Sequence, residues 1–305
     1  MDFIKPDINV DFVSRRRIAI ICSLVAALIG IGSLVLKGGP LYGIDFSGGT
    51  LVQVRFDQAP DVGEIRKALG EAGLGSSVIQ SLGEDKVAIR LKSQEGQADS
   101  VSDDLFGILV NQFGQERVSL ELVEMVGPQV GADMRRKGML SILYAMVGIL
   151  IYVTFRFQFR FALGAITALV HDIMITVGVF SLFNKEFSLP VIAALLTIIG
   201  YSLNDTIVVY DRIRENIRRM PKEKLAVVVN SSINQTLSRT ILTSGTTLLV
   251  VGCLFVLGGE VIHDFSFALI VGVMVGTYSS IYIASPILLL GGKGSAAART
   301  SVRQG

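Results

Sequence analysis

The sequence predicts a polytopic α-helical membrane protein with six transmembrane helices and one α+β ferredoxin-like extracytoplasmic domain. Half of its 305 residues are hydrophobic and only 18% are charged, whereas ordinary soluble domains have about 25% charged residues. Six apolar runs are long enough to cross a bilayer core, which takes about 20 residues. Between the first two runs the pattern changes to the alternation and helical spacing of a small α+β domain.

The predicted spans follow one another as residues 18–36, 139–155, 161–183, 189–210, 240–257 and 265–290, so that spans two to six occupy 135–291. Arg15, Arg16 and Arg17 precede the first run, as they would in a signal peptide. The run is long for a signal peptide, and Lys37-Gly38-Gly39-Pro40 follows it in place of a small-x-small cleavage site. We therefore expect an uncleaved anchor.

Orientation is predicted from Lys and Arg, which gather near one set of span ends. The positive-inside rule then places the N-terminus, 1–17, and the tail, 292–305, in the cytoplasm, with the tail disordered. Arg135-Arg136-Lys137 opposes this orientation, but these residues end a long translocated domain, where the rule is weak. The expected location is the cytoplasmic (inner) membrane.

The insert at residues 37–134 is predicted to be a periplasmic domain with the order β-α-β-β-α-β. Val62, Ile65 and Leu69 share one helix face, and Gly83-Glu84-Asp85 is a plausible hairpin turn. The expected strands are 51–56, 77–82, 86–91 and 118–126, and the expected helices are 60–73 and 101–113.

A carboxylate inside the fourth span is the strongest candidate for chemistry, because charges within spans are costly and often functional. Asp205 lies toward the cytoplasmic third of that span, and Arg239 opens the fifth. Two helices joined by a cytoplasmic loop place these residues at similar depth, so they can meet. Asp205 either makes a helix-packing hydrogen bond or titrates, and Arg239 either pairs with it or snorkels to the interface.

The third span contains a second candidate, His171-Asp172, near its middle. Asp172 is expected to be buried, either as a second relay carboxylate or as the partner of His171. His171 alone is more simply a packing residue with a satisfied side chain.

Several functional classes lack their signatures. There is no H-E-x-x-H, no G-x-S-x-G and no P-loop, so neither an enzyme nor direct use of ATP is expected. Cys22 and Cys253 lie in apolar runs, and no Cys/His pattern suggests a metal or cofactor. The net charge of +2 gives no indication of nucleic-acid binding, so the expected surroundings are a lipid bilayer, and an ion gradient or a partner must drive any work.

Three motifs resemble the SecF family of the bacterial protein-export machinery. They are GIDFSGGT at 43–50, GYSLNDTIVVYDRIREN at 200–216 and NQTLSRTILTSGTTL at 234–248, and the likeness extends over essentially the whole chain. The one-plus-five arrangement of spans agrees with half of a resistance–nodulation–division transporter.

The resemblance implies a complex and a mechanism. SecD would be the heterodimer partner, the SecYEG channel, YajC and YidC further partners, and a translocating preprotein the cargo, moved in late steps with the proton-motive force. In the family, an aspartate of the fourth span and an arginine at the start of the fifth have proton-pathway roles, which implies Asp205 and Arg239 here. We add Asn204, beside Asp205, and Thr243, which continues the face of Arg239, to this predicted pathway.

Two other classes of function remain open at this point. A stand-alone proton-driven exporter of small molecules would need a second six-span half and large porter domains, which the chain does not contain. A scaffold for the translocon without proton coupling would leave the cost of an intramembrane aspartate unexplained.

Overall fold

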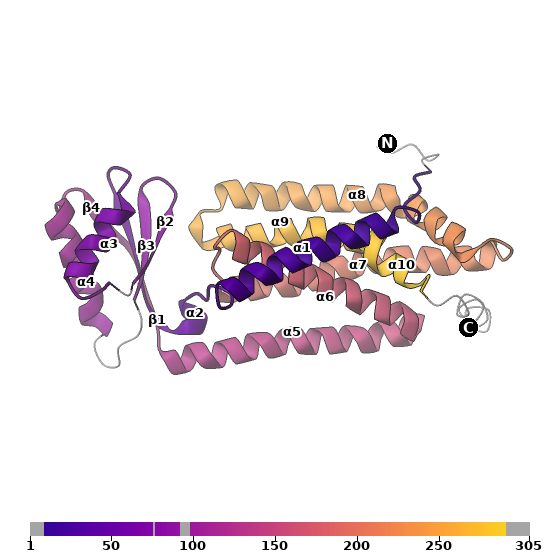
Figure 1. Cartoon of the computed structure of the whole chain (residues 1–305), viewed down its shortest axis with the longest axis horizontal. Helices are drawn as coiled ribbons and strands as arrows, with labels where there is room; N and C mark the ends of the chain where they lie inside the picture. Colours follow the sequence, from indigo (N-terminus) through magenta and orange to yellow (C-terminus); the bar gives the residue numbers. More distant parts are fainter. Residues whose placement is uncertain (1–8, 76, 92–97, 291–305) are drawn as a thin grey trace. The chain divides into compact units, whose positions relative to one another are not determined.

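The computed structural model describes residues 9–75, 77–91 and 98–290. The described chain forms two compact units, an α+β unit at Tyr42–Met139 and a helical unit formed by Met1–Leu41 and Leu140–Gly305 (Figure 1). The predicted tail, 292–305, and the first eight residues lie outside the described ranges.

The α+β unit confirms the predicted ferredoxin-like order. Its four strands form one sheet in the order β2-β3-β1-β4, with every neighbouring pair antiparallel. The elements are α2 (Ile44–Ser47), β1 (Gly49–Phe56), α3 (Val62–Glu71), β2 (Val78–Leu82), β3 (Lys86–Leu91), α4 (Ala98–Phe113) and β4 (Val118–Val126).

Alternation along β1 builds the core of this unit. Val52, Val54 and Phe56 are buried on one face of the sheet, where α3 and α4 cover them with leucine and isoleucine side chains. The carboxylate of Asp61 caps α3 by accepting a hydrogen bond from the Gly63 amide, at 2.7 Å. A period of two in the strand and of 3.6 in the helices therefore directs their apolar faces to the same core.

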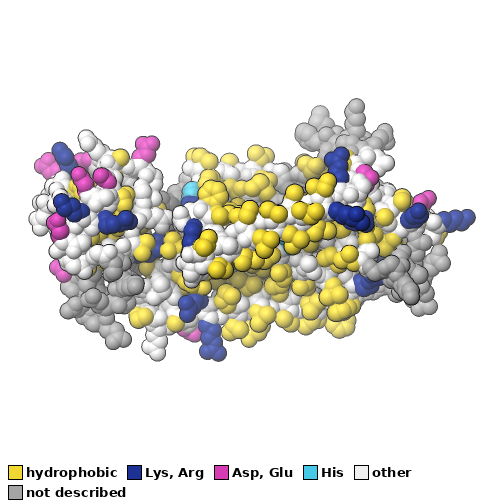
Figure 2. All heavy atoms as spheres, in the orientation of Figure 1, with side chains coloured by type: hydrophobic (Ala, Val, Ile, Leu, Met, Phe, Trp, Pro, Cys, Tyr) yellow, Lys and Arg dark blue, Asp and Glu magenta, His cyan; other side chains and the backbone are white. Residues whose placement is uncertain are grey.

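Six helices of the described chain are long and apolar enough to cross a membrane, one for each predicted span. Figure 2 shows hydrophobic side chains gathered along the face of the membrane-crossing helices that is in view, as expected for a surface that meets lipid. The elements are α1 (Arg16–Leu36), α5 (Pro128–Phe157), α6 (Phe159–Leu182), α7 (Leu189–Arg219), α8 (Leu225–Leu257), α9 (Glu260–Ser279), the π-helical turn η1 (Ser280–Ala284) and α10 (Ser285–Ile287).

Glycines bring pairs of these helices into close contact. A Cβ added at Gly30 of α1 would lie 2.8 Å from the Cα of Gly178 on α6. A Cβ at Gly164 would lie 2.3 Å from the Tyr210 hydroxyl, which donates a hydrogen bond to the Ala284 carbonyl at 3.2 Å. Any larger residue would push these helices apart, so the small side chains set the packing distance.

The connection between the fourth and fifth spans differs from the expected loop. α7 continues to Arg219 and α8 already begins at Leu225, so most of the connection is helical. Charged and polar residues interrupt the apolar sequence of this hairpin, so a search for continuous apolar runs does not detect its amphipathic helices. Its apolar stripe is buried in a core that includes Ile213, Ile217, Val228, Val229 and Ile233.

A segment before α1 is fastened to this hairpin, and we call it the N-terminal strap (residues 10–13). The Val10 amide donates to Asn234 Oδ1 at 2.8 Å, and the Val10 carbonyl accepts from the Nδ2 atoms of both Asn230 and Asn234. The amides of Phe12 and Val13 both donate to Asn230 Oδ1. Two asparagine side chains thus satisfy the strap backbone as a neighbouring strand would.

Candidate functional site

Asp205 is a buried carboxylate with an unmatched oxygen. Its side chain belongs to α7, and the residue is 4% exposed. Within the described part of the chain, its Oδ2 atom has no hydrogen-bond partner. Buried polar atoms are nearly always paired in native structures, so this atom calls for an explanation.

Arg239 is a cation at matching depth on α8. Asp205 lies 16 residues from the start of α7 and Arg239 lies 18 residues from the end of α8, which are about 24 Å and about 27 Å along the helices. Among the described residues, however, no hydrogen bond or ion pair joins the two side chains.

The other two residues of the predicted proton pathway are Asn204, on the same helix as Asp205, and Thr243, on the same helix as Arg239. Asn204 and Arg239 are both exposed on the helical unit. The Thr243 hydroxyl donates to the carbonyls of Arg239, at 2.9 Å, and Thr240, at 3.0 Å. Thr243 therefore bonds the backbone of its own helix in this structure. The side chains of Asp205 and Arg239 are in a separated arrangement.

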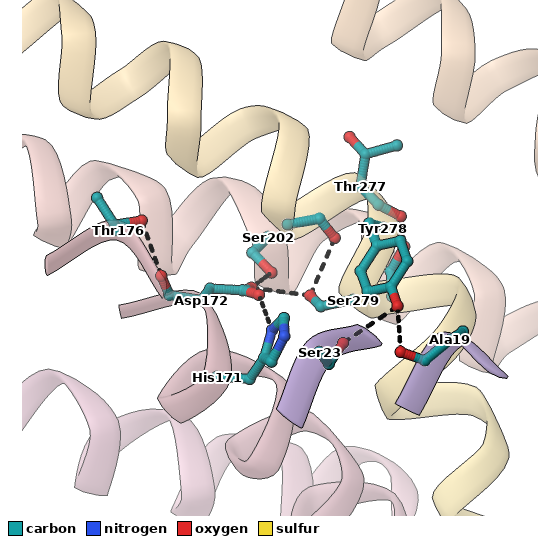
Figure 3. Close-up of polar contacts among 11 residues, drawn as sticks. Ala19, Ser23, His171, Asp172, Thr176, Ser202, Thr277, Tyr278 and Ser279 are labelled. Atoms are coloured by element: carbon teal, nitrogen blue, oxygen red, sulfur yellow. Dashed lines mark hydrogen bonds and ion pairs between the residues drawn. The ribbon is translucent and has the colours of Figure 1, made fainter. Parts of the chain in front are cut away.

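Asp172 is the opposite case, because its carboxylate is fully engaged (Figure 3). The residue is 0% exposed, and its Oδ2 accepts hydrogen bonds from Ser202 of α7, at 2.6 Å, and Ser279 of α9, at 2.9 Å. Its Oδ1 lies 3.0 Å from Nδ1 of His171, so one carboxylate connects α6, α7 and α9. We call Asp172, His171, Ser202 and Ser279 the Asp172 hub.

The hub extends to α1 through an aromatic side chain. The rings of His171 and Tyr278 are stacked, with centroids 6.2 Å apart. The Tyr278 hydroxyl donates to the Ala19 carbonyl at 2.6 Å and accepts from Ser23 at 3.1 Å (Figure 3). The structure therefore brings His171 and Asp172 together, which is one of the two alternatives that the sequence leaves open for Asp172, and adds partners from three other helices.

The partners of Asp172 were not identified from the sequence. Ser202 stands three residues before Asp205 on α7, so the hub and the unmatched carboxylate are one helical turn apart. Ser279 adjoins a stripe of small residues on the last span, which indicates close packing and nothing more. A second polar link runs from Tyr201 to Ser244 and on to Thr277. Across the described residues, no group of three or more His, Cys, Asp or Glu could hold a metal ion.

Comparison with known proteins decides the family. The family model described as protein export membrane protein SecD/SecF, C-terminal, matches residues 108–293. The protein translocase subunit SecF of Magnetococcus marinus is 50% identical over 93% of this chain and 93% of its own length. The chain belongs to the SecF family of protein translocase subunits. SecF of Calditerrivibrio nitroreducens is 46% identical over 95% of this chain and 96% of its own length.

A solved structure from the same family agrees with the fold. The crystal structure of SecDF, a translocon-associated membrane protein from Thermus thermophilus, has a TM-score of 0.86 and 38% identity to this chain. The match covers 94% of this chain and 39% of the SecDF chain, so this chain spans well under half of that protein. The SecD/SecF match at 108–293 contains Asp172, Asp205 and Arg239.

The SecD/SecF GG motif matches residues 40–60, and the structure gives a physical reason for its glycines. Gly48 has φ +68° and Gly49 has φ +128°, which L side chains rarely adopt. A Cβ at Gly48 would lie 2.6 Å from the Cα of Pro128, where α5 begins. In this SecF chain the glycine pair therefore turns α2 into β1 and lets the turn contact the start of α5.

Proposed function

We propose that this SecF-family chain pairs with SecD in the cytoplasmic membrane and uses the proton-motive force to promote late steps of preprotein translocation. The role is not enzymatic: protonation of a buried carboxylate changes the arrangement of helices. The observation that carries the proposal is that Asp205 Oδ2 is buried and has no hydrogen-bond partner among the described residues, while Arg239 lies at a similar depth on the next helix.

The separated pair is one state of a two-state element. An ionised carboxylate buried without a cation or a hydrogen-bond donor is costly, whereas a guanidinium in contact stabilises it. A residue that alternates between these surroundings alternates between its neutral and ionised forms. Proton uptake from the outer side in the separated state, and release to the inner side on engagement with Arg239, would carry one proton inward per cycle.

The free energy that one proton supplies is sufficient to change the arrangement of α7 and α8. One charge that crosses a membrane potential of 100 mV contributes about 2.3 kcal/mol. A tenfold change in the ratio of two states takes about 1.4 kcal/mol, so a single proton can change the population of α7–α8 arrangements more than tenfold.

The need for SecD follows from exposed polar groups at membrane depth. Asn204 and Arg239 are exposed on two helices that are long and apolar enough to cross a membrane, and lipid tails cannot satisfy an amide or a guanidinium. The SecDF relative contains further chain beyond the part that this chain matches. We therefore propose that SecD covers this polar face. SecYEG, YajC, YidC and a preprotein complete the proposed assembly.

The deciding experiment replaces Asp205 by Asn in the complex with SecD and measures proton flux and gradient-dependent export. We expect both to be lost while the complex still assembles. Asp205→Glu should retain part of the activity, because an acid of similar proton affinity remains. Asp211→Asn is the matched control, since Asp211 is also an aspartate of α7 but half exposed and paired with Arg156 at 3.3 Å.

A scaffold role gives a different result. If Asp205→Asn supports export and proton flux at the rate of the unmodified complex, the carboxylate is structural and the proton-coupled function is wrong.

A further inference from the structure

A groove in the helical unit adjoins the Asp172 hub through His171, but it takes no part in the proposed proton step at Asp205. It has a volume of about 410 Å³ and is bounded by α1, α6, η1 and α10, and we call it the α1–α6 groove. Ligand pockets in proteins typically have about 300–1,000 Å³, so the groove is large enough to hold part of a small molecule. Its walls are mainly apolar and include Ile20, Leu24, Ala27, Val170, Met174 and Ile287.

The polar side chains in the groove wall already have partners. Ser23 donates to the Tyr278 hydroxyl at 3.1 Å, and Thr167 donates to the carbonyl of Leu163 at 2.8 Å. His171 directs Nδ1 to Asp172. Because these groups are occupied within the protein, the interior of the groove favours an apolar ligand over a polar one.

The groove has a cation at one end. Arg16, the first residue of α1, lines it, and its guanidinium makes a long contact of 3.4 Å with the Val13 carbonyl. This is the end at which α1 begins and α10 ends, where the apolar run stops. Arginine at the end of a span normally lies at the level of lipid headgroups, where it attracts anionic lipids.

The length of the groove matches one leaflet. From Arg16 to Ala27, the last groove residue on α1, eleven helical steps amount to about 16 Å. The hydrocarbon core of a bilayer is about 30 Å thick, so one leaflet contributes about 15 Å. A chain that enters beside Arg16 and follows the groove therefore reaches the middle of the bilayer.

We propose that the α1–α6 groove binds one acyl chain of an anionic phospholipid, with the phosphate-bearing headgroup at Arg16. The apolar wall takes the acyl chain, the depth fits a single leaflet, and the guanidinium complements the negative headgroup. A zwitterionic phospholipid fits the same wall but carries no net charge for Arg16. The groove therefore selects among bilayer lipids by charge at its mouth.

The first test counts bound lipid on the full chain by native mass spectrometry. The protein is delipidated and titrated with phosphatidylglycerol or phosphatidylcholine of the same acyl composition. We expect one tight phosphatidylglycerol site, which Arg16→Gln weakens about fivefold. Arg17→Gln is the matched control, because it removes the same charge from an exposed neighbour that does not line the groove. Equal losses in the two variants, or no loss in either, would overturn the proposal.

The second test locates the acyl chain and uses the absence of tryptophan from the sequence. Ile20→Trp reports on the groove, and Leu249→Trp reports on a lipid-facing position of α8 that is 71% exposed. Each variant is placed in nanodiscs of 10% brominated phosphatidylglycerol in phosphatidylcholine. We expect stronger quenching at the groove reporter, and loss of this excess when Arg16→Gln is added. Equal quenching at the two reporters, or an excess that survives Arg16→Gln, would show that no anionic lipid is selected.

Discussion

The two buried aspartates of the helical unit have the same side chain and opposite surroundings. Asp172 has two serine donors on Oδ2 and a histidine beside Oδ1, whereas Oδ2 of Asp205 has no partner within the described chain. A fully bonded carboxylate stabilises the helices that supply its donors, and a rearrangement would break those bonds. At the scale of the residue, Asp172 is thus suited to hold helices together and Asp205 to change state.

Substitutions of Asp172 should separate these roles. Asp172→Asn keeps an oxygen that can accept from Ser202 and Ser279, so we expect near-normal thermal stability and near-normal export. Asp172→Ala leaves the buried Ser202 hydroxyl without its acceptor, at about 1–3 kcal/mol, and leaves the Ser279 hydroxyl with the Gly276 carbonyl, at 3.1 Å, as its acceptor. The midpoint of thermal unfolding in detergent should fall clearly for the alanine variant only. Loss of proton flux in a stable Asp172→Asn variant would instead make Asp172 a second proton carrier.

Gly48 allows a residue-scale test of the turn before β1. Gly48→Ala adds a Cβ that would lie 2.6 Å from Pro128, at a φ of +68°. Gly38→Ala is the matched control, since its φ is +74° but the added Cβ meets nothing within 4 Å. Backbone strain is common to both, at about 1 kcal/mol, so the steric contact should add to the loss only at Gly48. Equal shifts in the unfolding midpoint would contradict this reading of the glycine pair.

At the scale of elements, the strap connects the start of α1 to the hairpin of α7 and α8, two segments that the hydropathy pattern alone does not relate to each other. Its backbone bonds to Asn230 and Asn234 join the start of α1 to the extended hairpin of α7 and α8. Arg239 stands five residues beyond Asn234 on the same helix. Any movement of α8 in the proposed proton cycle therefore involves the strap as well as the neighbouring helices.

Removal of the Asn230 side chain should release the N-terminal strap. Asn230→Ala deletes the acceptor that the amides of Phe12 and Val13 share, and each hydrogen bond contributes about 0.5–1.5 kcal/mol. The Phe12 amide keeps its bond to the Val10 carbonyl, at 3.1 Å, so amide hydrogen exchange should accelerate roughly tenfold at Val13 and less at Phe12. Gln235→Ala is the control, because Gln235 bonds Asn216 and Ser231 instead of the strap. Unchanged exchange in Asn230→Ala would show that packing alone holds the strap.

At the scale of the whole molecule, the helices divide into inner and outer sets. Half or more of the apolar window is buried in α6, in α7 and in the last span, whereas the share is 22% or less in α1, α5 and α8. Both buried aspartates lie on inner helices, where neighbouring helices exclude lipid. The outer helices offer their apolar faces to the bilayer and to the proposed SecD partner.

Membrane orientation gives a prediction for the entire chain. We expect the α+β unit outside and the strap inside, because Lys and Arg are concentrated near the strap end of the spans. With Cys22 and Cys253 replaced by Ala, Glu84→Cys should react with an impermeant maleimide in intact spheroplasts. Ser14→Cys should react only after the membrane is opened. The reverse labelling pattern would overturn the topology.

The local sequence pattern is sufficient to predict the helices and strands, but it is insufficient to predict the contacts between them. β4 has the predicted bounds because alternation is a property of neighbouring residues. The extended hairpin of α7 and α8 is not found by a search for apolar runs, because its stripe is apolar on one face only. Ser279 lies 107 residues from Asp172, and no periodicity within one helix reports on a partner in another. Charge alone identified Asp205, Arg239 and Asp172, since a charge in a span stands out in any window.

The strap also has a consequence for the order in which the protein is completed. Val10 is 224 residues away from Asn234, and a ribosome adds about 5–20 residues per second. Roughly 10–45 s therefore pass between synthesis of the strap and synthesis of its asparagine partner. Throughout that interval, the backbone groups of the strap must form their hydrogen bonds with water while the intervening helices enter the membrane. Closure of the strap is thus a late event in biogenesis, and it occurs only after the fourth span and the start of the fifth have been made.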